Sequence, residues 1–343
     1  MSGDEPGTDR VTDVRRSAER GRTAARALAS EPNSLASTPE LDWHAGTLRR
    51  RAVRRLGLAV GVPPWALPRN VAVELAFWRA VRASSGDRQW RRLTWGYTAL
   101  AYHRLAGECQ PGRERYDVAP KRFRRGLSVL RWAGFRPLSP EDLLSVHWGG
   151  EPPRGRRFVV TIDDGYLDAV VAARDTGSSR PHLYVPTDEV GSTPPWSEER
   201  PLASWTQLHE AERAGAVLGT HAAVHAPLVG LNAAQLDEQV RGSLQTLRAH
   251  STDALAALAY PNGKHDEQVR NWAVAAGYRL AWTTLPGRNG ASTDPWSLRR
   301  VSPKDWDGPL SVLWKALTGT TLPATWDRLN QRRWAALRRP ARR

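Results

Sequence analysis

Cysteine and long apolar segments are scarce in this sequence. Its 343 residues include one cysteine, Cys109, which excludes an intramolecular disulfide framework and a metal site built from several cysteines. The longest apolar run, residues 56–67, is interrupted by Pro63 and Pro64 and is too short to span a bilayer. The first twenty residues are polar and lack the apolar core of a secretion signal. These absences predict a cytoplasmic protein.

Lysine is also scarce, because only 4 of the 50 basic residues are lysines, although the net charge is +15. Such a charge is compatible with nucleic-acid binding, but the arginines do not outline a module with interleaved stacking aromatics. We therefore expect no nucleic-acid partner. The tail 328–343 has seven arginines and no acidic residue, and its Trp334 and Leu337 lie three apart. It is either a solvated tail or an interfacial helix in peripheral contact with the anionic inner face of a membrane.

The chain changes in texture along its length. The first 40 residues are rich in polar and charged types, which predicts disorder. A helix with one apolar face is then indicated by Leu75, Trp78 and Val81. Strand-like and helical segments alternate afterwards, which predicts a parallel sheet covered by helices. The expected domains are a disordered segment 1–40, a helical extension 41–95, an α/β domain 96–305, and a C-terminal helix with an arginine-rich tail 306–343.

Polar residues follow several of the predicted strands directly. Asp163 and Asp164 come after "VVTI", His221 comes after "VLGT", and Pro261 and Asn262 come after "LAALAY". In a barrel of parallel strands, the carboxyl ends converge on one mouth, where the chemistry takes place. The alternative for the aspartates is a simple Asp-Asp-Gly turn.

His221 and His225 are four residues apart, so a helical turn would place both imidazoles on one side. Two histidines and one carboxylate are a common ligand set for a divalent metal. Asp164 could then bind the cation, and Asp163 could accept a proton from a water molecule whose pKa the cation lowers. Because the chain has 9 histidines, a pair at this spacing can also arise by chance or for packing.

Three stretches together resemble the polysaccharide deacetylase family (NodB-homology domains, carbohydrate esterase family 4). "TIDDGY" is similar to its first motif, T-F-D-D-G, and "THAAVHAP" to its second, H-[ST]-x-x-H-P, with Ala222 in place of the hydroxyl residue and Ala226 before the proline. "AYPNGKHD" is similar to the third motif, F-A-Y-P-Y-G. The resemblance runs from about residue 97 to 302 in the order of the family.

The resemblance implies a fold, a cofactor and a set of roles. The fold would be a deformed (β/α) barrel, here with an N-terminal helical extension, holding one divalent metal that is often zinc. Asp163 would be the catalytic base, and Asn262 would offer its backbone N–H to the oxyanion. Tyr260 and Pro261 would shape the substrate groove. The metal ligands would be Asp164, His221 and His225.

Two expected residues are missing. Many members carry an arginine two residues before the third-motif proline, where this chain has Ala259. Many also supply a late histidine as the acid that protonates the leaving amine, but the corresponding "SLRRVSP" has none, and Arg300 cannot release a proton near neutral pH. His103 is the nearest substitute for that acid; the alternative is a hydrogen-bonded histidine of the core.

The favoured function is metal-dependent hydrolysis of N-acetyl, or O-acetyl, groups on an amino-sugar glycan or glycan precursor. A degenerate member that binds a glycan without turnover is the alternative, since an arginine and a histidine are missing. A basic adaptor for nucleic acid or membrane, built from the termini, is the third hypothesis.

Overall fold

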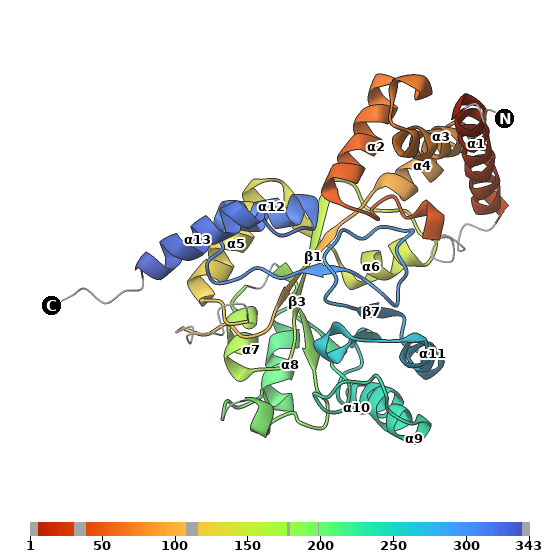
Figure 1. The fold of residues 1–343 in the computed structure, drawn as a ribbon. Coiled ribbons are helices and arrows are strands. Elements are labelled where there is room, and N and C mark those ends of the chain that lie inside the picture. The colour runs from red at the N-terminus through yellow and green to blue at the C-terminus, as the bar shows by residue number, and fades with distance from the viewer. Residues whose placement is uncertain (1–5, 31–38, 108–115, 177–178, 198, 338–343) are drawn as a thin grey trace. The chain divides into compact units, whose positions relative to one another are not determined.

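The computed structural model describes residues 6–30, 39–107, 116–176, 179–197 and 199–337, and Figure 1 shows their fold. Clustering of the chain gives two compact units. We call the first the helical unit; it comprises residues 1–96, 145–152 and 290–294. The second, which we call the barrel unit, comprises residues 97–144, 153–289 and 295–343.

The helical unit is built mainly from four helices. The apolar face predicted from Leu75, Trp78 and Val81 is present, because all three side chains are buried. Trp78 and Val81 share a core with Trp43 and Leu93. The helices are α1 (Pro6–Ser30), α2 (Leu48–Val60), α3 (Arg69–Ser84) and α4 (Asp87–Thr94).

The prediction that residues 1–40 are disordered is wrong for residues 6–30, which form α1. Along α1, Ser17, Gly21, Ala25 and Leu28 recur every three or four residues and are buried. A Cβ on Gly21 would come within 2.4 Å of the carbonyl oxygen of Phe77, so α1 and α3 approach very closely. Composition does not indicate this helix, because its buried face has mainly small side chains and its other residues are mainly polar or charged. Residues 1–5 and 31–38 of the predicted disordered segment lie outside the described residues.

The barrel unit contains a sheet of eight strands, and every ladder between them is parallel. Its order is β7-β6-β5-β4-β3-β1-β8, with β2 paired to β3. Trp282, the last residue of β7, forms a parallel bridge with Leu298, which precedes β8. This bridge nearly closes the sheet. The predicted deformed (β/α) barrel is thereby confirmed. The strands are β1 (Thr98–Tyr102), β2 (Phe135–Pro137), β3 (Arg156–Ile162), β4 (His182–Val185), β5 (Val217–Thr220), β6 (Ala257–Ala259), β7 (Leu280–Trp282) and β8 (Arg300–Val301).

Strands β2 and β8 had no counterpart in the sequence prediction. They have three and two residues, and each contains an arginine, Arg136 or Arg300. A strand this short cannot show the alternation or apolar run by which strands are recognised. Only pairing with a neighbouring strand defines them.

Helices cover the outside of the strands (Figure 1). Local capping fixes two of them: Ser204 and Gln207 form a capping box at the start of α8, and α11 begins at the cap Asp266 and ends at Gly277. These helices are α5 (Pro120–Trp132), α6 (Pro140–His147), α7 (Leu167–Arg174), α8 (Trp205–Arg213), α9 (Ala233–Leu236), α10 (Ser243–His250) and α11 (Glu267–Ala276), with a π-helical turn, Asp237–Gly242, between α9 and α10.

Two further helices, α12 (Pro309–Thr318) and α13 (Ala324–Leu337), follow the last strand. The last part of the predicted arginine-rich tail, residues 338–343, lies outside the described residues. No helix in the described part of the chain has the length and apolar character needed to cross a membrane.

Candidate metal centre and catalytic site

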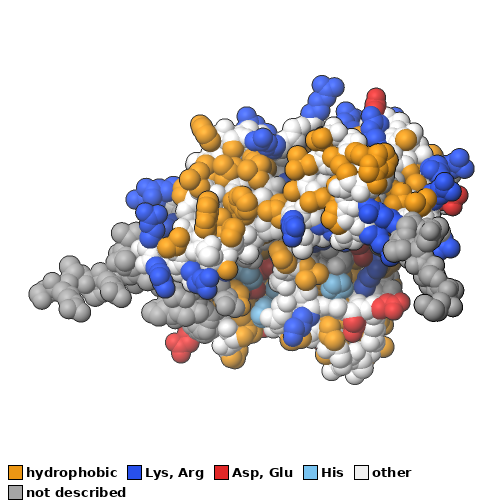
Figure 2. Space-filling model, turned by 45° about the horizontal axis from the view of Figure 1, so that its top comes forward, with side chains coloured by type: hydrophobic (Ala, Val, Ile, Leu, Met, Phe, Trp, Pro, Cys, Tyr) orange, Lys and Arg blue, Asp and Glu red, His pale blue; other side chains and the backbone are white. Residues whose placement is uncertain are grey.

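Most of the predicted site residues line a cavity of about 540 Å³. His103 follows β1, Asp163 and Asp164 follow β3, and His221 follows β5, so the cavity lies at the carboxyl ends of the strands. Histidine side chains are visible in a hollow of the molecular surface in Figure 2. The lining residues are His103, Arg104, Tyr116, Asp117, Asp163, Asp164, Tyr166, Trp196, His221, His225, Tyr260, Asn262, Gly263, Thr284, Arg300, Ser302 and Lys304.

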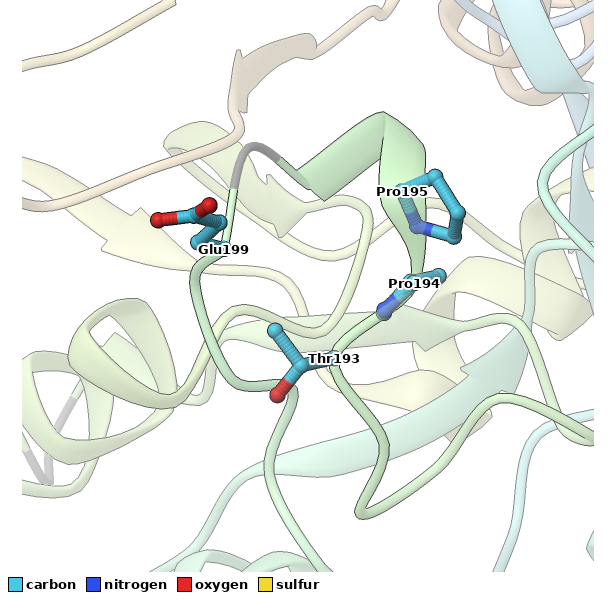
Figure 3. Close-up of a pocket in the computed structure, with 4 residues that line it drawn as sticks. All are labelled: Thr193, Pro194, Pro195 and Glu199. Atoms are coloured by element: carbon cyan, nitrogen blue, oxygen red, sulfur yellow. The ribbon is translucent and has the colours of Figure 1, made fainter.

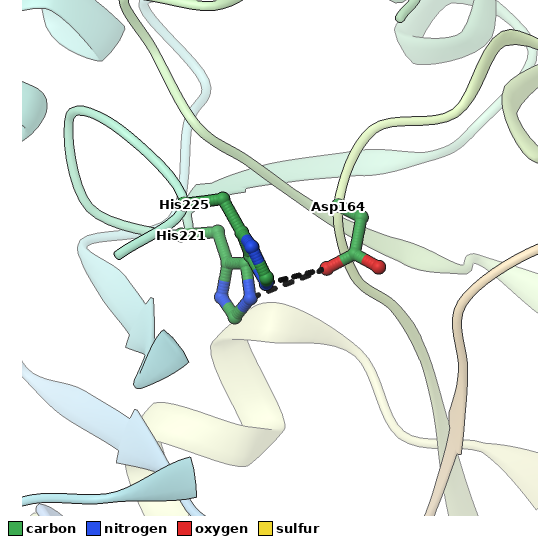
Figure 4. A group of neighbouring side chains, drawn as sticks. All are labelled: Asp164, His221 and His225. Carbon is green, nitrogen blue, oxygen red and sulfur yellow. Dashed lines mark ion pairs between the residues drawn. The ribbon is translucent and has the colours of Figure 1, made fainter. Parts of the chain in front are cut away.

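Asp164, His221 and His225 converge on one point (Figure 4). The Nε2 atoms of both histidines lie 3.4 Å from Oδ1 of Asp164. Ligand atoms bound tetrahedrally to zinc at about 2.0–2.2 Å lie roughly 3.3–3.6 Å from one another. The buried Oδ1 of Asp164 has no hydrogen-bond partner among the described residues. An orphaned carboxylate oxygen facing two imidazole nitrogens at this spacing fits a divalent cation.

The backbone around this group adopts conformations that L-residues rarely occupy. Asp164, Ala222 and Asn262 have φ angles of 71°, 66° and 57°. Such backbone strain concentrates at functional sites, and alanine tolerates it less well than aspartate or asparagine. The segment after His221 is an irregular series of bends, so the helical turn considered from the spacing to His225 is wrong. The imidazoles meet, with ring centroids 5.1 Å apart, because the chain turns sharply at Ala222.

Neighbouring groups orient both imidazoles. Nδ1 of His221 lies 2.7 Å from the carbonyl oxygen of Ala259 and donates its proton there, so Nε2 is the nitrogen that faces Asp164. The backbone N–H of His225 donates to Glu189, which also accepts from the indole of Trp196. The Trp196 ring lies against His225 with centroids 4.3 Å apart. Both histidines are therefore held before any ligand arrives.

Asp163 is bound by an arginine that the sequence interpretation set aside. Nη1 of Arg300 lies 2.7 Å from Oδ1 of Asp163, and the two side chains are 1% and 2% exposed. The same Nη1 donates to Oγ1 of Thr161, and Nε donates to the carbonyl oxygen of Thr283. Arg300 lacks a proton it could release, but it is a fixed cation on the predicted base. No local pattern could reveal this, since 137 positions separate the partners.

The charge state of the aspartates follows from these neighbours. Burial by itself would raise the pKa of Asp163, but the positive charge of Arg300 and the nearby His221 and His103 hold it below its usual value. Burial would likewise raise the pKa of Asp164, yet the imidazoles of His221, His103 and His225 lower it. Two adjacent buried carboxylates can thus both remain ionised, because Arg300 and the surrounding imidazoles lower the pKa of Asp163, and the imidazoles lower that of Asp164.

The structure separates the remaining predicted residues into cavity-lining and supporting ones. His103 lines the cavity and stands edge-to-face with Tyr116, at 5.3 Å between centroids. Tyr260 and Asn262 also line it, and the Tyr260 hydroxyl donates to the carbonyl of Trp296. Pro261 is buried at the start of a short 3-10 turn, Pro261–Gly263, and is not among the cavity-lining residues. Its predicted place in the groove wall is therefore corrected to a supporting one.

Several cavity residues were not predicted. Arg104 is paired with Asp117 and Asp168, and Lys304 lies over the ring of Trp306. They lie in loops, where neither a motif nor periodicity identifies them. A separate pocket lined by Thr193, Pro194, Pro195 and Glu199 (Figure 3) has one ionisable side chain and no histidine, so it lacks the elements of a metal centre.

Comparisons with known proteins agree with this geometry. Residues 150–281 match the family model "Polysaccharide deacetylase". The Bacillus subtilis (strain 168) protein named "Putative polysaccharide deacetylase YxkH" is 23% identical over 188 residues, which cover 54% of this chain and 64% of that protein. The match thus spans less than two thirds of the relative's length.

Two solved structures share the fold. The Streptococcus pyogenes deacetylase PplD, in complex with acetate, superposes with a TM-score of 0.57 at 21% identity, over 65% of this chain and 98% of that one. IcaB from Ammonifex degensii gives 0.56 at 23% identity, over 64% and 96%. The resemblance predicted from the three strand-end motifs is confirmed: residues 150–281 are similar to the polysaccharide deacetylase family.

Proposed function

We propose that this protein hydrolyses acetamido groups on an amino-sugar glycan or glycan precursor, with the help of one divalent metal. The observation that carries the proposal is the coexistence, in one cavity, of the Asp164–His221–His225 group and a separate Asp163–Arg300 pair. The first supplies ligands for a cation, and the second keeps an ionised carboxylate beside it. Hydrolysis consumes one water and yields acetate and a free amine; an O-acetyl ester would give acetate and an alcohol.

Asp164, His221 and His225 would hold the metal. When bound, the metal polarises the scissile carbonyl and lowers the pKa of water. The distances between the ligand atoms match those of a tetrahedral zinc site. Nδ1 of His221 donates its proton to the carbonyl oxygen of Ala259, so Nε2 is the nitrogen available to the metal.

Asp163 acts as the general base. Its Oδ1 is occupied by Arg300, which leaves Oδ2 to accept the proton of the attacking water. The buried guanidinium fixes the plane of the carboxylate through three acceptors: Asp163, Thr161 and Thr283. Arg300 therefore replaces, from β8, the arginine that family members carry at the position of Ala259.

His103 protonates the leaving amine. It follows β1 and lines the same cavity as Asp163 and Asp164. The backbone N–H of Asn262 assists the developing oxyanion, and such a donor contributes about 2–4 kcal/mol in comparable sites. Tyr260 and Trp196 provide aromatic walls for a sugar ring.

We also propose a cytoplasmic location with peripheral contact at the inner face of the membrane. The support is the arginine-rich sequence of the tail, 328–343. The expected soluble partner is an N-acetylated carbohydrate.

Metal analysis joined to acetate release tests the function. The purified protein should contain one equivalent of divalent metal and release acetate from oligomers of N-acetylated amino sugars. His221→Ala should lose both properties. His209→Ala is the matched control, because the His209 ring is hydrogen-bonded to the carbonyl of His250 and is not among the residues that line the cavity. Bound metal and glycan without acetate release from any substrate of the panel would favour the non-hydrolysing alternative.

A further inference from the structure

The helix α12 packs Val312 and Ala316 into the core of the barrel unit and leaves two leucines exposed. Ser311 and Lys315 are 6% and 0% exposed, and the ammonium group of Lys315 is bonded to Asp307. In contrast, Leu310 and Leu317, which are seven residues and therefore two turns apart, are 76% and 41% exposed. Apolar residues of a surface helix ordinarily face the core, so these two leucines form an exposed apolar strip on α12.

The helix α13 is attached to the barrel unit through polar contacts. The Asn330 side chain donates to the hydroxyl of Ser311 on α12 at 3.0 Å. Asp327 accepts from the indole of Trp306 at 3.0 Å. Because these residues are three apart, they define one face of α13, and this face rests on the protein.

Trp326 and Leu329 of α13 lie outside this face. Trp326 is 62% exposed and Leu329 is 56% exposed. Arg328, Arg332 and Arg333 are exposed on the same helix. Figure 2 shows hydrophobic and basic side chains next to one another on the side of the molecule that leads to the C-terminus. We call Trp326, Leu329, the three arginines, and Leu310 and Leu317 of α12 the C-terminal surface.

We propose that the C-terminal surface binds an anionic lipid surface. Tryptophan and leucine beside arginine suit the boundary of a bilayer, where the rings enter the acyl region and the guanidinium groups meet lipid phosphates. The proposed membrane contact thus includes side chains of α12 and α13 in addition to the arginine-rich tail. A second copy of the chain is a poor occupant, because the net charge is +15 and the same arginines would face each other. An acidic protein is the other occupant that the test must distinguish.

Sedimentation of the full-length protein with vesicles tests the proposal. The protein should sediment with vesicles of phosphatidylglycerol and phosphatidylcholine in equal amounts, and not with phosphatidylcholine alone. Arg328→Gln, Arg332→Gln and Arg333→Gln combined should weaken binding by about 100-fold, since each arginine near an anionic surface contributes roughly fivefold. Trp326→Ser with Leu329→Ser keeps the charge and should weaken binding at least about tenfold.

Trp65→Ser is the matched control, because Trp65 is 79% exposed in the helical unit and its loss should leave binding unchanged. Metal content and acetate release on a soluble substrate, measured in parallel, should be unchanged in all variants, so a failure of the proposed hydrolysis is recognised separately. Failure to bind anionic vesicles would overturn the proposal, as would binding that the α13 variants do not weaken. Retention on immobilised polyglutamate without vesicle binding would assign the surface to an acidic protein instead.

Discussion

Each unit of this protein buries an arginine, and the two arginines have different surroundings. In the helical unit, Arg54 is 4% exposed, is paired with Glu74 at 2.7 Å, and lies over the rings of Trp43 and Trp78. In the barrel unit, Arg300 is 2% exposed, is paired with Asp163 at 2.7 Å, and lines the cavity.

The contrast shows that a buried ion pair does not by itself indicate a functional site. Arg54 fills a core between aromatic rings, and its remaining donor goes to the carbonyl of Trp43. Arg300 instead donates to Asp163, Thr161 and Thr283, and Asp163 lines the cavity beside a candidate metal centre. The cavity on the far side of the carboxylate, and not the burial, assigns the functional role.

The largest effect is expected from removing the charge of each acidic partner. Asp163→Asn keeps the shape of the side chain but loses the basic oxygen, so hydrolysis should fall by about 10²–10⁴-fold while metal remains bound. Glu74→Gln, the matched change in the helical unit, should leave acetate release unchanged. Steady-state rates and elemental analysis measure both. Near-normal hydrolysis by Asp163→Asn would remove the functional half of the comparison.

Exchanging the arginines for lysine tests geometry at constant charge. Arg300→Lys cannot bond to Asp163, Thr161 and Thr283 together, so the base loses its orientation and kcat should drop by roughly 10–100-fold. Arg54→Lys should lower the free energy of unfolding by about 1–3 kcal/mol without changing kcat. Urea denaturation and kcat together check the pair of variants. Equal kcat values for the two lysine variants would contradict the distinction.

A third prediction concerns the packing of the helical unit. Gly21→Val places methyl groups against the carbonyl of Phe77 and should cost about 1–3 kcal/mol, because α1 must move away from α3. Arg22→Val puts the same side chain on the exposed face of α1 and should cost much less. Urea denaturation gives the free energies. If Gly21→Val were as stable as Arg22→Val, the close contact between these helices would be absent in solution.

The smallest effect should be acid sensitivity, which the units share. Burial lowers the pKa of His182, in the barrel unit, to about 3, and that of His147, in the helical unit, to about 4. Both stay neutral when folded but gain a proton when unfolded below about pH 6.5, so stability falls as the pH drops from there toward the folded pKa. At about pH 5.5 each histidine should cost roughly 1.4 kcal/mol relative to pH 7.

Replacing either residue with glutamine should remove its share of this pH dependence, as seen in urea denaturation at both pH values. The loss should be of similar size for His182→Gln and His147→Gln. A wild-type protein whose unfolding free energy does not change between the two pH values would show that these imidazoles are already protonated in the folded state.

The barrel and the candidate metal-ligand group could be predicted from the sequence. Apolar runs followed by polar residues identify strand ends, and parallel strands bring such ends together, so Asp164, His221 and His225 could be predicted to meet. These features depend on residue type and local spacing. The caps of α8 and α11 could be predicted for the same reason.

Three features could not be predicted from the sequence: the partner of Asp163, the formation of α1, and the side of α13 that faces outward. Arg300 reaches Asp163 because β8 pairs with β1, a contact across 137 positions that no local pattern encodes. The order of α1 depends on a close approach to α3 at Gly21, and the orientation of α13 depends on partners for Asp327 and Asn330. In each case the stabilising contact is made with residues elsewhere in the chain, and neither composition nor local periodicity identifies such partners.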